Sequence, residues 1–448
     1  MSGGSVSGRT VGASRWRGVL GIPEISARGH RWLVVAVFVD TLGVGMVVPL
    51  SFLYFTLSTN LSLAGVGAAL SAAILLSLPT GFVAGTLVDR YGSKPLLIIN
   101  NVVAAVGYLL YVFATDWFGV FSSMFVVMVA DRMYWAAWPA FVKRATGAAD
   151  MDAWFALTEA VKNGCFGIGA LLGAAALAID GKAGATVLIV LNAISSLVAA
   201  WLFALIKVDA PRTNTPAAPS GATTTAMASA TERPVRPWVH VLRQRWMLPL
   251  VLAQSALTFA WLLPVSILPV YAVNVLHLGA WLPSTLFALN CVGVFFLQPL
   301  VTARLRPVRR TRAVMVSGLL AIVAIVVLAA VPKASGDGTA LLPSVLVVAA
   351  SLLVTTASMF YLPSSNALIS SAAEAEFEGR TVSLFQMAWA FSAGVGPALI
   401  GGLLDTNPQC LWLLLGALTL AGSLGFLLAE RLLPRHSLLA SAPATATT

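Results

Sequence analysis

Residues 85–94 read Gly-Thr-Leu-Val-Asp-Arg-Tyr-Gly-Ser-Lys, a short polar loop between two long apolar stretches. Gly85 would let a neighbouring helix approach closely, and Gly92 would permit a tight turn. The Asp89 carboxylate can cap the positive N-terminal end of another helix. The loop therefore predicts a tight connection between two apolar helices.

The composition of the whole chain indicates that these helices lie in a membrane. Of 448 residues, 27 are Lys or Arg and 17 are Asp or Glu, so only 10% carry a charge, whereas 58% are apolar. Soluble domains carry about 25% charged residues. The composition excludes soluble enzymes and disordered chains, and the apolar runs are about twice as long as the strands of a membrane barrel. We expect an all-α integral membrane protein.

Apolar runs of 18 or more residues predict twelve membrane-spanning helices. They lie at residues 32–57, 63–88, 95–115, 117–143, 153–179, 184–207, 247–275, 279–303, 313–332, 342–369, 381–404 and 410–432. Residues 208–246 are rich in Thr, Ala, Pro and Ser, which cannot bury enough apolar surface to become ordered. We therefore expect two six-helix bundles, 32–207 and 247–432, joined by this linker and flanked by tails at 1–31 and 433–448. No cleavable signal peptide is expected, because the N-terminal tail has no apolar core.

The distribution of Lys and Arg predicts the orientation of the chain. If the N-terminus is cytoplasmic, 23 of the 27 basic residues lie on the cytoplasmic side and only Lys182 and Lys333 lie outside. Both termini and the linker are therefore expected in the cytoplasm, with the chain in the plasma (inner) membrane. The net charge of +10 then favours insertion and contact with anionic lipid, and no nucleic-acid partner is expected.

The loop at residues 85–94 resembles the signature loop of the major facilitator superfamily, G-x-L-x-D-R-x-G-x-K. The matching residues are Gly85, Asp89, Arg90, Gly92 and Lys94. The resemblance implies twelve helices in two bundles related by a pseudo-two-fold axis, a monomer, and a loop that acts as a conformational latch between the bundles. The corresponding loop after the eighth span has Ala303 where the acid should stand, so the latch is expected on one side only.

The first span resembles that of the twelve-span drug:proton antiporters, and most closely the tetracycline exporters. Asp40, Gly43, Gly45 and Pro49 have the spacing found there. An ionisable residue two turns into a membrane helix costs about 2.5–3.5 kcal/mol on insertion scales. Asp40 is therefore a candidate for proton coupling, with a structural hydrogen bond between helices as the alternative.

Four further ionisable residues lie inside the N-terminal bundle. Asp131 and Arg132 are in the fourth span, and Glu159 and Lys162 stand one helical turn apart in the fifth. Three acids and two bases leave one carboxylate without a cationic partner. We expect Asp40, Asp131 and Glu159 to include the proton site and Arg132 and Lys162 to pair with the acids, unless the whole cluster is a permanently paired structural unit.

The antiporter motif of the family, G-x-x-x-G-P-x-x-G-G, is incomplete in the fifth span. Its glycines survive at Gly164, Gly169 and Gly173, but Ala170 replaces the proline. The sequence therefore leaves the direction of transport open.

Polar and aromatic residues interrupt the otherwise apolar spans, and each can serve simply to bridge helices. Together they suit a largely apolar cavity with scattered hydrogen-bonding groups. They are Tyr134, Trp135, Trp138, Gln254, Trp261, Asn290, Tyr361, Asn366, Gln386 and Trp389. Such a cavity favours a bulky amphipathic organic substrate over a sugar or an inorganic ion.

These observations predict a secondary transporter that exports a hydrophobic or amphipathic drug-like or antibiotic-like compound in exchange for protons. Proton-coupled uptake of an organic metabolite is the alternative. An integral-membrane enzyme or a non-transporting receptor is more remote, because no span contains a histidine and no Asp-rich or His-rich cluster occurs. The three cysteines, Cys165, Cys291 and Cys410, have no metal-site spacing. No cofactor is expected, and the absence of a Walker loop excludes ATP as the direct energy source.

Overall fold

The computed structural model of the chain describes residues 28–146, 151–207, 237–268, 271–278, 282–331 and 341–439. Within these ranges all regular secondary structure is helical. The helices form two bundles, and the predicted all-α membrane fold is confirmed.

The N-terminal bundle contains the first six expected spans. Its elements are α2 (Arg28–Val47), η1 (Val48–Leu50), α3 (Ser51–Ser58), α4 (Leu63–Leu76), α5 (Thr80–Tyr91), α6 (Ser93–Phe113), α7 (Trp117–Thr146) and α8 (Met151–Leu205). Helix α8 includes both the fifth and the sixth span. The chain turns between these two spans at Asp180 and Gly181, where the backbone is not helical. Gly181 has φ +50° there, a conformation that glycine adopts readily.

The C-terminal bundle contains the other six. Its elements are α10 (Met247–Thr258), η2 (Phe259–Leu262), η3 (Leu263–Ile267), η4 (Tyr271–Val275), α12 (Leu282–Leu305), α13 (Arg310–Ala329), α14 (Leu341–Ala372), α15 (Glu378–Thr406) and α16 (Pro408–Ala429). Two short helices, α9 (Pro237–Arg243) and α17 (Arg435–Leu438), lie before and after these spans.

Several spans are less regular than the apolar runs suggested. Nine described helices are long and apolar enough to cross a membrane, and α4 with α5, bent by 41°, would form a tenth. The remaining two expected spans correspond to α15 and to residues 247–275, where the α-helix ends at Thr258 and gives way to 3-10 and π turns around Pro264. The first span changes to a 3-10 turn at Pro49 for the same reason, because proline lacks the amide hydrogen that an α-helix needs.

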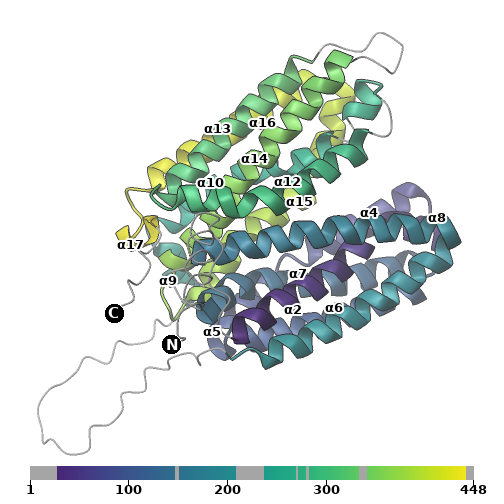
Figure 1. Cartoon of the computed structure of the whole chain (residues 1–448), viewed down its shortest axis with the longest axis horizontal. Coiled ribbons are helices and arrows are strands. Elements are labelled where there is room, and N and C mark those ends of the chain that lie inside the picture. Colours follow the sequence, from purple (N-terminus) through teal and green to yellow (C-terminus); the bar gives the residue numbers. More distant parts are fainter. Residues whose placement is uncertain are drawn as a thin grey trace, which may run out of the picture.

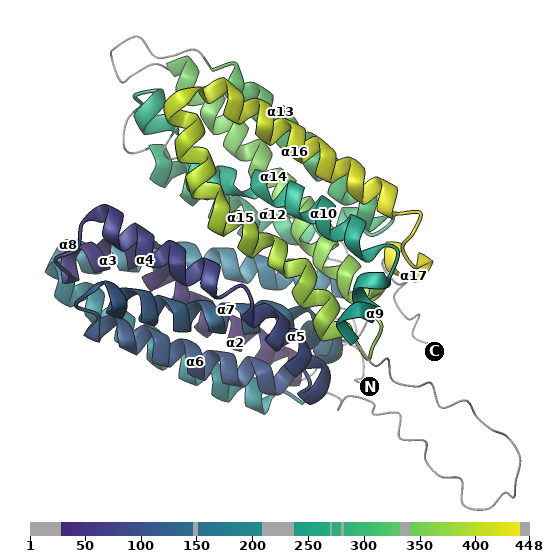
Figure 2. The same cartoon turned by 180° about the vertical axis from the view of Figure 1, so that it is seen from behind.

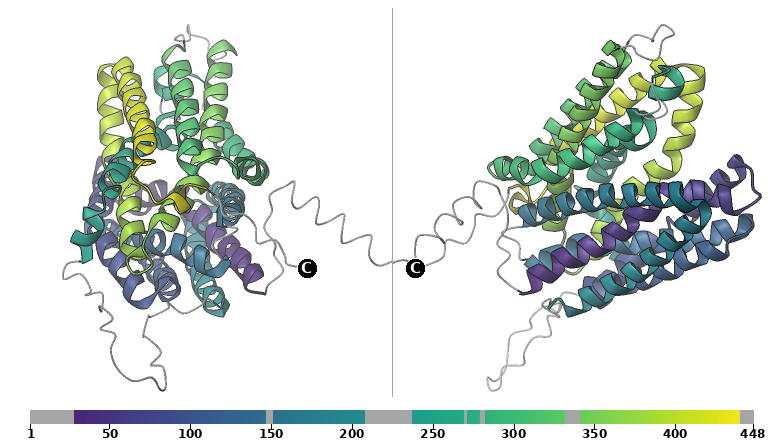
Figure 3. Two further views of the ribbon diagram at one scale, coloured as in Figure 1. Left: turned by 90° about the vertical axis from the view of Figure 1, so that its left-hand side faces the viewer. Right: turned by 45° about the vertical axis from the view of Figure 1, so that its right-hand side comes forward.

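The two bundles meet at one end and spread apart towards the other (Figure 1). The end at which they meet contains α5, α9 and α17, and we call it the convergent end. Seen from behind, α15 leans across this end towards α5 and α7 (Figure 2), and the turned views show the same divergence away from it (Figure 3). Contact between the bundles is not confined to this end, because α8 also packs along α12, where Phe166 and Phe287 meet.

The end of the expected linker differs from the sequence-based expectation. Residues 208–236 lie outside the described residues, but Pro237–Arg243 form α9. Trp238 packs edge-on against Phe82 of α5 at 5.0 Å between ring centroids, and Arg380 of α15 lies over the Trp238 ring. These contacts order the segment, which the composition alone could not indicate.

Candidate functional site

Five charged side chains lie inside the N-terminal bundle, on α2, α7 and α8. Arg132 Nη2 is 3.5 Å from Asp131 Oδ2, and Lys162 Nζ donates a hydrogen bond to Glu159 Oε1 at 3.1 Å. Arg132, Glu159 and Lys162 are at most 13% exposed. Opposite charges buried this deeply need each other, since a lone buried charge is costly.

Asp40 is the fifth charge, and its carboxylate forms no ion pair or hydrogen bond with any part of the chain that the structure describes. Lys162 lies close enough for its charge to act on the carboxylate. Tyr108 and Tyr134 also interact electrostatically with Asp40. The structure thus brings together the three acids and two bases that were singled out from the sequence, and it leaves Asp40 as the acid without a direct partner.

Lys162 is surrounded by aromatic rings as well as by Glu159. Its Nζ lies 4.5 Å from the ring centroid of Trp138, 5.0 Å from that of Trp135 and 5.2 Å from that of Tyr134. The rings of Tyr134 and Trp138 are stacked, with 14° between their planes, whereas Trp135 stands edge-on to Tyr134. We call these three residues the aromatic box; they were expected to line a cavity, and they surround a cation of the protein itself.

The aromatic box also connects the two ion pairs. Trp135 Nε1 donates a hydrogen bond to Asp131 Oδ1 at 3.1 Å, one helical turn away. Asp131 in turn pairs with Arg132. The four paired charges therefore form one network through Trp135, and Asp40 lies beside it on α2.

Glycines allow α2 to approach the first half of α8 closely. A Cβ atom on Gly169 would lie 2.7 Å from backbone atoms of Gly45 and Leu42, and one on Gly173 would lie 2.8 Å from the Met46 carbonyl oxygen. These are the surviving glycines of the incomplete antiporter motif. The backbone contact holds Asp40 against the helix that carries Glu159 and Lys162.

In the C-terminal bundle, three of the expected cavity residues form hydrogen bonds between helices. Asn290 Nδ2 donates to Thr355 Oγ1 at 2.9 Å, which joins α12 to α14. Gln386 Nε2 donates to Asn366 Oδ1 at 2.9 Å, which joins α15 to α14. These amides have structural partners within their own bundle.

Four other residues, three of them aromatic, form a cluster in the same bundle. The Trp261 and Tyr361 rings are stacked 4.8 Å apart, and Trp389 lies 6.2 Å from Tyr361. Gln254 and Tyr361 are fully buried, and Gln254, Trp261 and Trp389 lie around the Tyr361 hydroxyl. Their mutual contacts do not reach good hydrogen-bond geometry in the described residues, so a ligand or water can still compete for these polar groups.

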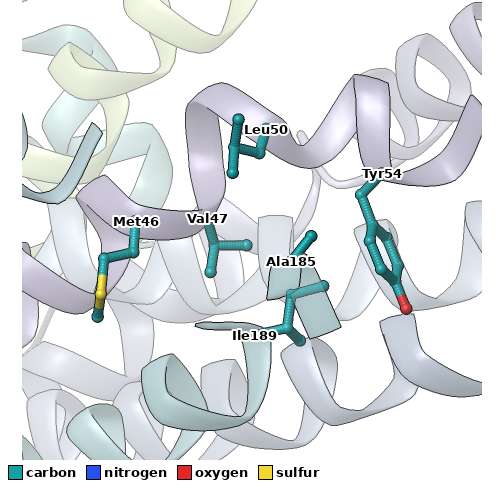
Figure 4. Close-up of a pocket in the computed structure, with 6 residues that line it drawn as sticks. All are labelled: Met46, Val47, Leu50, Tyr54, Ala185 and Ile189. Carbon is teal, nitrogen blue, oxygen red and sulfur yellow. The ribbon is translucent and has the colours of Figure 1, made fainter. Parts of the chain in front are cut away.

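A small apolar pocket lies elsewhere in the N-terminal bundle (Figure 4). It is lined by Met46, Val47, Leu50, Tyr54, Ala185 and Ile189. Its empty space is about 170 Å³, including its open mouth, whereas drug-sized ligands occupy about 300–1,000 Å³. The pocket is a packing gap beside the break in the first span, and we place no substrate there.

At the convergent end, the loop after the second span contacts the beginning of α15. Asp89 accepts hydrogen bonds from the Gly379 amide at 2.5 Å and from Arg380 Nη1 at 2.7 Å. Gly85 and Gly379 touch, since a Cβ on Gly379 would lie 2.5 Å from the Gly85 carbonyl oxygen. Asp89 thus caps the N-terminus of a helix in the other bundle.

The remaining residues of the loop act within the N-terminal bundle. Lys94 Nζ donates to the carbonyl oxygens of Ala204 and Ile206 at 2.8 Å each, at the end of α8. Gly92 has φ +89°, as the tight turn between α5 and α6 requires. Arg90 is exposed and stacks on the adjacent Tyr91.

A second contact between the bundles corrects the expectation of a one-sided latch. Arg310, at the start of α13, forms a two-pronged ion pair with Asp152 in the first turn of α8, at 2.5 and 3.0 Å. It also donates to the Ser371 hydroxyl and to the Ser437 carbonyl oxygen of α17, both at 2.9 Å. The start of the ninth span therefore holds the beginning of the fifth span, with a base on α13 and an acid on α8.

Comparison with known proteins identifies the fold. The sequence profile described as Major Facilitator Superfamily matches residues 33–397. The chain belongs to the major facilitator superfamily. Its structure is similar to that of the human organic anion transporter MFSD10 (TETRAN), with a TM-score of 0.64 and 16% identity over 91% of this chain and 100% of that chain. This likeness shows the fold, and a search of curated proteins found no match. Membership indicates a multi-pass secondary transporter rather than an enzyme.

This superfamily member is closed at its convergent end. A third contact there, which the sequence analysis missed, joins Glu378 of α15 to Lys143 Nζ at 2.9 Å and Arg144 Nη2 at 3.5 Å on α7. The Glu378 side chain is only 4% exposed. Three groups of ion pairs therefore link the bundles at the end where the helices converge.

The sequence analysis also missed polar residues beside Asp40. Asn192 in the second half of α8 is fully buried, and its side chain interacts with the Tyr108 hydroxyl. A Cβ on Gly43, one turn from Asp40, would lie 2.5 Å from Asn192 Oδ1. The contact between Asn192 and Gly43 could not be predicted from the sequence, because the two residues are 149 positions apart and Asn192 is a single amide in a long apolar run.

Proposed function

We propose that this transporter exports hydrophobic or amphipathic organic compounds in exchange for protons. The observation that carries the proposal is Asp40, an acid inside a membrane bundle in which the other four charges pair with each other. A desolvated carboxylate without a cationic partner favours its neutral, protonated form, and it loses the proton when water reaches it. Asp40 can therefore take up a proton on one side of the membrane and release it on the other.

The two aromatic clusters support an amphipathic organic substrate. Trp261, Tyr361 and Trp389 provide flat apolar surfaces, and the buried amide of Gln254 beside the Tyr361 hydroxyl provides a donor and an acceptor. Ligand sites of this kind are mostly apolar with a few polar groups that fix orientation. We propose that these four residues contribute the C-terminal half of the substrate site.

We also propose that the convergent end faces the cytoplasm and that the chain lies in the plasma (inner) membrane. The support is the excess of Lys and Arg, 23 against two, in the segments expected on that side. A reporter enzyme fused after residue 225 is expected to lie in the cytoplasm. Detection of the reporter on the extracellular side would contradict the orientation.

The latch contacts suggest how access alternates between the two sides. With Asp89, Asp152 and Glu378 paired, the convergent end is closed. Opening it requires these pairs to separate, while the helices close at the opposite end around substrate or proton. A transporter needs both states within a few kcal/mol of each other.

Transport in liposomes of uniform orientation tests the proposal. The purified full chain is reconstituted, the liposomes are loaded with members of a panel of hydrophobic dyes, and the side opposite the convergent end is made acidic. An exporter is expected to move dye towards the acidic side, against its gradient. Dye movement away from the acidic side would instead favour proton-coupled uptake, and transport that ignores the pH gradient would overturn proton coupling.

A further inference from the structure

The aromatic box has the chemistry of a binding site for an organic cation. Faces of Trp and Tyr rings attract ammonium groups, and boxes of two or three rings recognise quaternary ammonium ligands. The three rings around Lys162 Nζ lie within 5.2 Å of it, which is inside the range of this interaction. An ammonium group therefore already occupies the box, and it belongs to the protein.

Lys162 is suited to leave this position. Its ammonium sits on a flexible four-carbon stem, and it is paired with Glu159 on the same helix rather than held from several sides by acids. A second carboxylate, Asp40 of α2, interacts with it electrostatically and has no other partner in the described residues. Lys162 thus has an alternative acidic partner outside the box.

We propose that the aromatic box is the subsite for the cationic group of the transported compound and that Lys162 is its resident competitor. This inference rests on the proposed transport function and names the substrate class as lipophilic organic cations. When the substrate cation enters the box, Lys162 turns towards Asp40, and when Lys162 returns, it displaces the substrate. The Glu159 carboxylate, which pairs with Lys162, remains beside the box.

Competition of this kind connects substrate release with protonation of Asp40. A proton on Asp40 removes the alternative partner of Lys162, so the lysine returns to the box and the substrate leaves. The charged and titratable groups that act here come from every helix around the box: Asp40 on α2, Tyr108 on α6, Asp131, Arg132 and Tyr134 on α7, Glu159 and Lys162 on α8, and Cys291 on the adjacent α12.

Two probes of equal shape and opposite charge test the proposal. Equilibrium dialysis measures binding of tetraphenylphosphonium and tetraphenylborate to the full chain in detergent, without any gradient. In the double variant Glu159→Gln/Lys162→Met, which removes both charges of the pair and strands neither, tetraphenylphosphonium is expected to bind at least about tenfold more tightly than to the unaltered chain. Tetraphenylborate is expected to gain no affinity. An unchanged or lower affinity for the phosphonium, or an equal gain for the borate, would overturn the proposal.

Matched variants distinguish binding of the probe by the aromatic box from general effects of the substitutions. Lys162→Arg keeps a cation over the rings and is expected to give no gain, whereas an equal gain would contradict competition. Adding Trp135→Leu to the double variant is expected to abolish the gain, and its persistence would show that the rings do not bind the probe. If the double variant does not fold, Lys162→Gln, whose amide can still bond to Glu159, serves in its place. Because binding is measured without a gradient, a chain that binds the cation but exchanges no proton would overturn the transport proposal alone.

Discussion

Replacing Asp40 with asparagine is expected to abolish proton-driven export while still allowing substrate exchange down its gradient, with a lower substrate affinity because Lys162 then has no alternative acidic partner. Asparagine has nearly the shape of aspartic acid and remains neutral, so it imitates the protonated state permanently. Because Asp40 has no direct partner in the described residues, the substitution strands no buried charge. In liposomes that contain the variant, the dye is expected to reach equal concentrations on both sides of the membrane and not to accumulate on the acidic side.

The same substitution at Asp116 provides the control. Asp116 is an exposed carboxylate that accepts a hydrogen bond from the Gly119 amide at the start of α7, so Asp116→Asn is expected to retain full coupling. Full proton-driven export by Asp40→Asn would rule out Asp40 as the proton site. Glu159 would then be the next acid to test, although it is paired with Lys162.

Replacing Asp89 or Asp152 with alanine is expected to favour the state that is open at the convergent end and to slow transport. Asp89 holds Gly379 and Arg380 across the bundles, and Asp152 holds Arg310. Each substitution is expected to shift the equilibrium by about 1–3 kcal/mol, or about 5–150-fold. The two contacts lie on separate helices and share no residue, so the double variant is expected to show the sum of the two shifts.

Spin labels at positions 91 and 376 can measure this shift. Tyr91 and Glu376 are exposed on opposite bundles at the convergent end, and the distribution of distances between the labels reports the open fraction. Glu374→Ala is the matched control, because the bonds of that exposed acid in the described part of the chain go to His240 and Gln244, which lie beside its own bundle. Unchanged distance distributions and wild-type rates in well-folded Asp89→Ala and Asp152→Ala would show that these pairs do not hold the end closed.

The positions of the helices could be predicted from the sequence because the membrane imposes a simple requirement. About 20 consecutive apolar residues must span it, and the chain has such runs. The breaks at Pro49 and Pro264 were also visible as prolines, but a proline in a membrane helix does not by itself predict a broken span. The structure shows turns at both places.

Partners that lie far apart in the sequence could not be predicted. Asp152 and Arg310 are 158 residues apart, and Lys143 and Glu378 are 235 apart. Counting bases for topology identified Lys143 and Arg310 as members of an excess of positive charge and gave no reason to assign them acids. By contrast, the pair Glu159 and Lys162 was evident, because residues three apart on a helix face the same way.

The aromatic residues show a third kind of limit. Tyr134, Trp135 and Trp138 were expected to line a cavity, but their spacing does not say what they surround. The direction of each ring depends on how α7 packs against α8. Only the structure shows that Lys162 lies over all three rings.

The opposite polarity of the two latch contacts bears on how the halves of this protein have diverged. In one half Asp89 at the end of α5 meets the start of α15, which carries a base, and in the other Arg310 at the start of α13 meets the start of α8, which carries an acid. The halves retain the same architecture but are no longer interchangeable modules. A chimera in which residues 85–94 replaced the loop after α12 would put Asp89 at the position of Ala303, seven residues before Arg310, so it would not reproduce the pair with Asp152. Each half thus joins the other at the convergent end with residues from a different place in its own sequence.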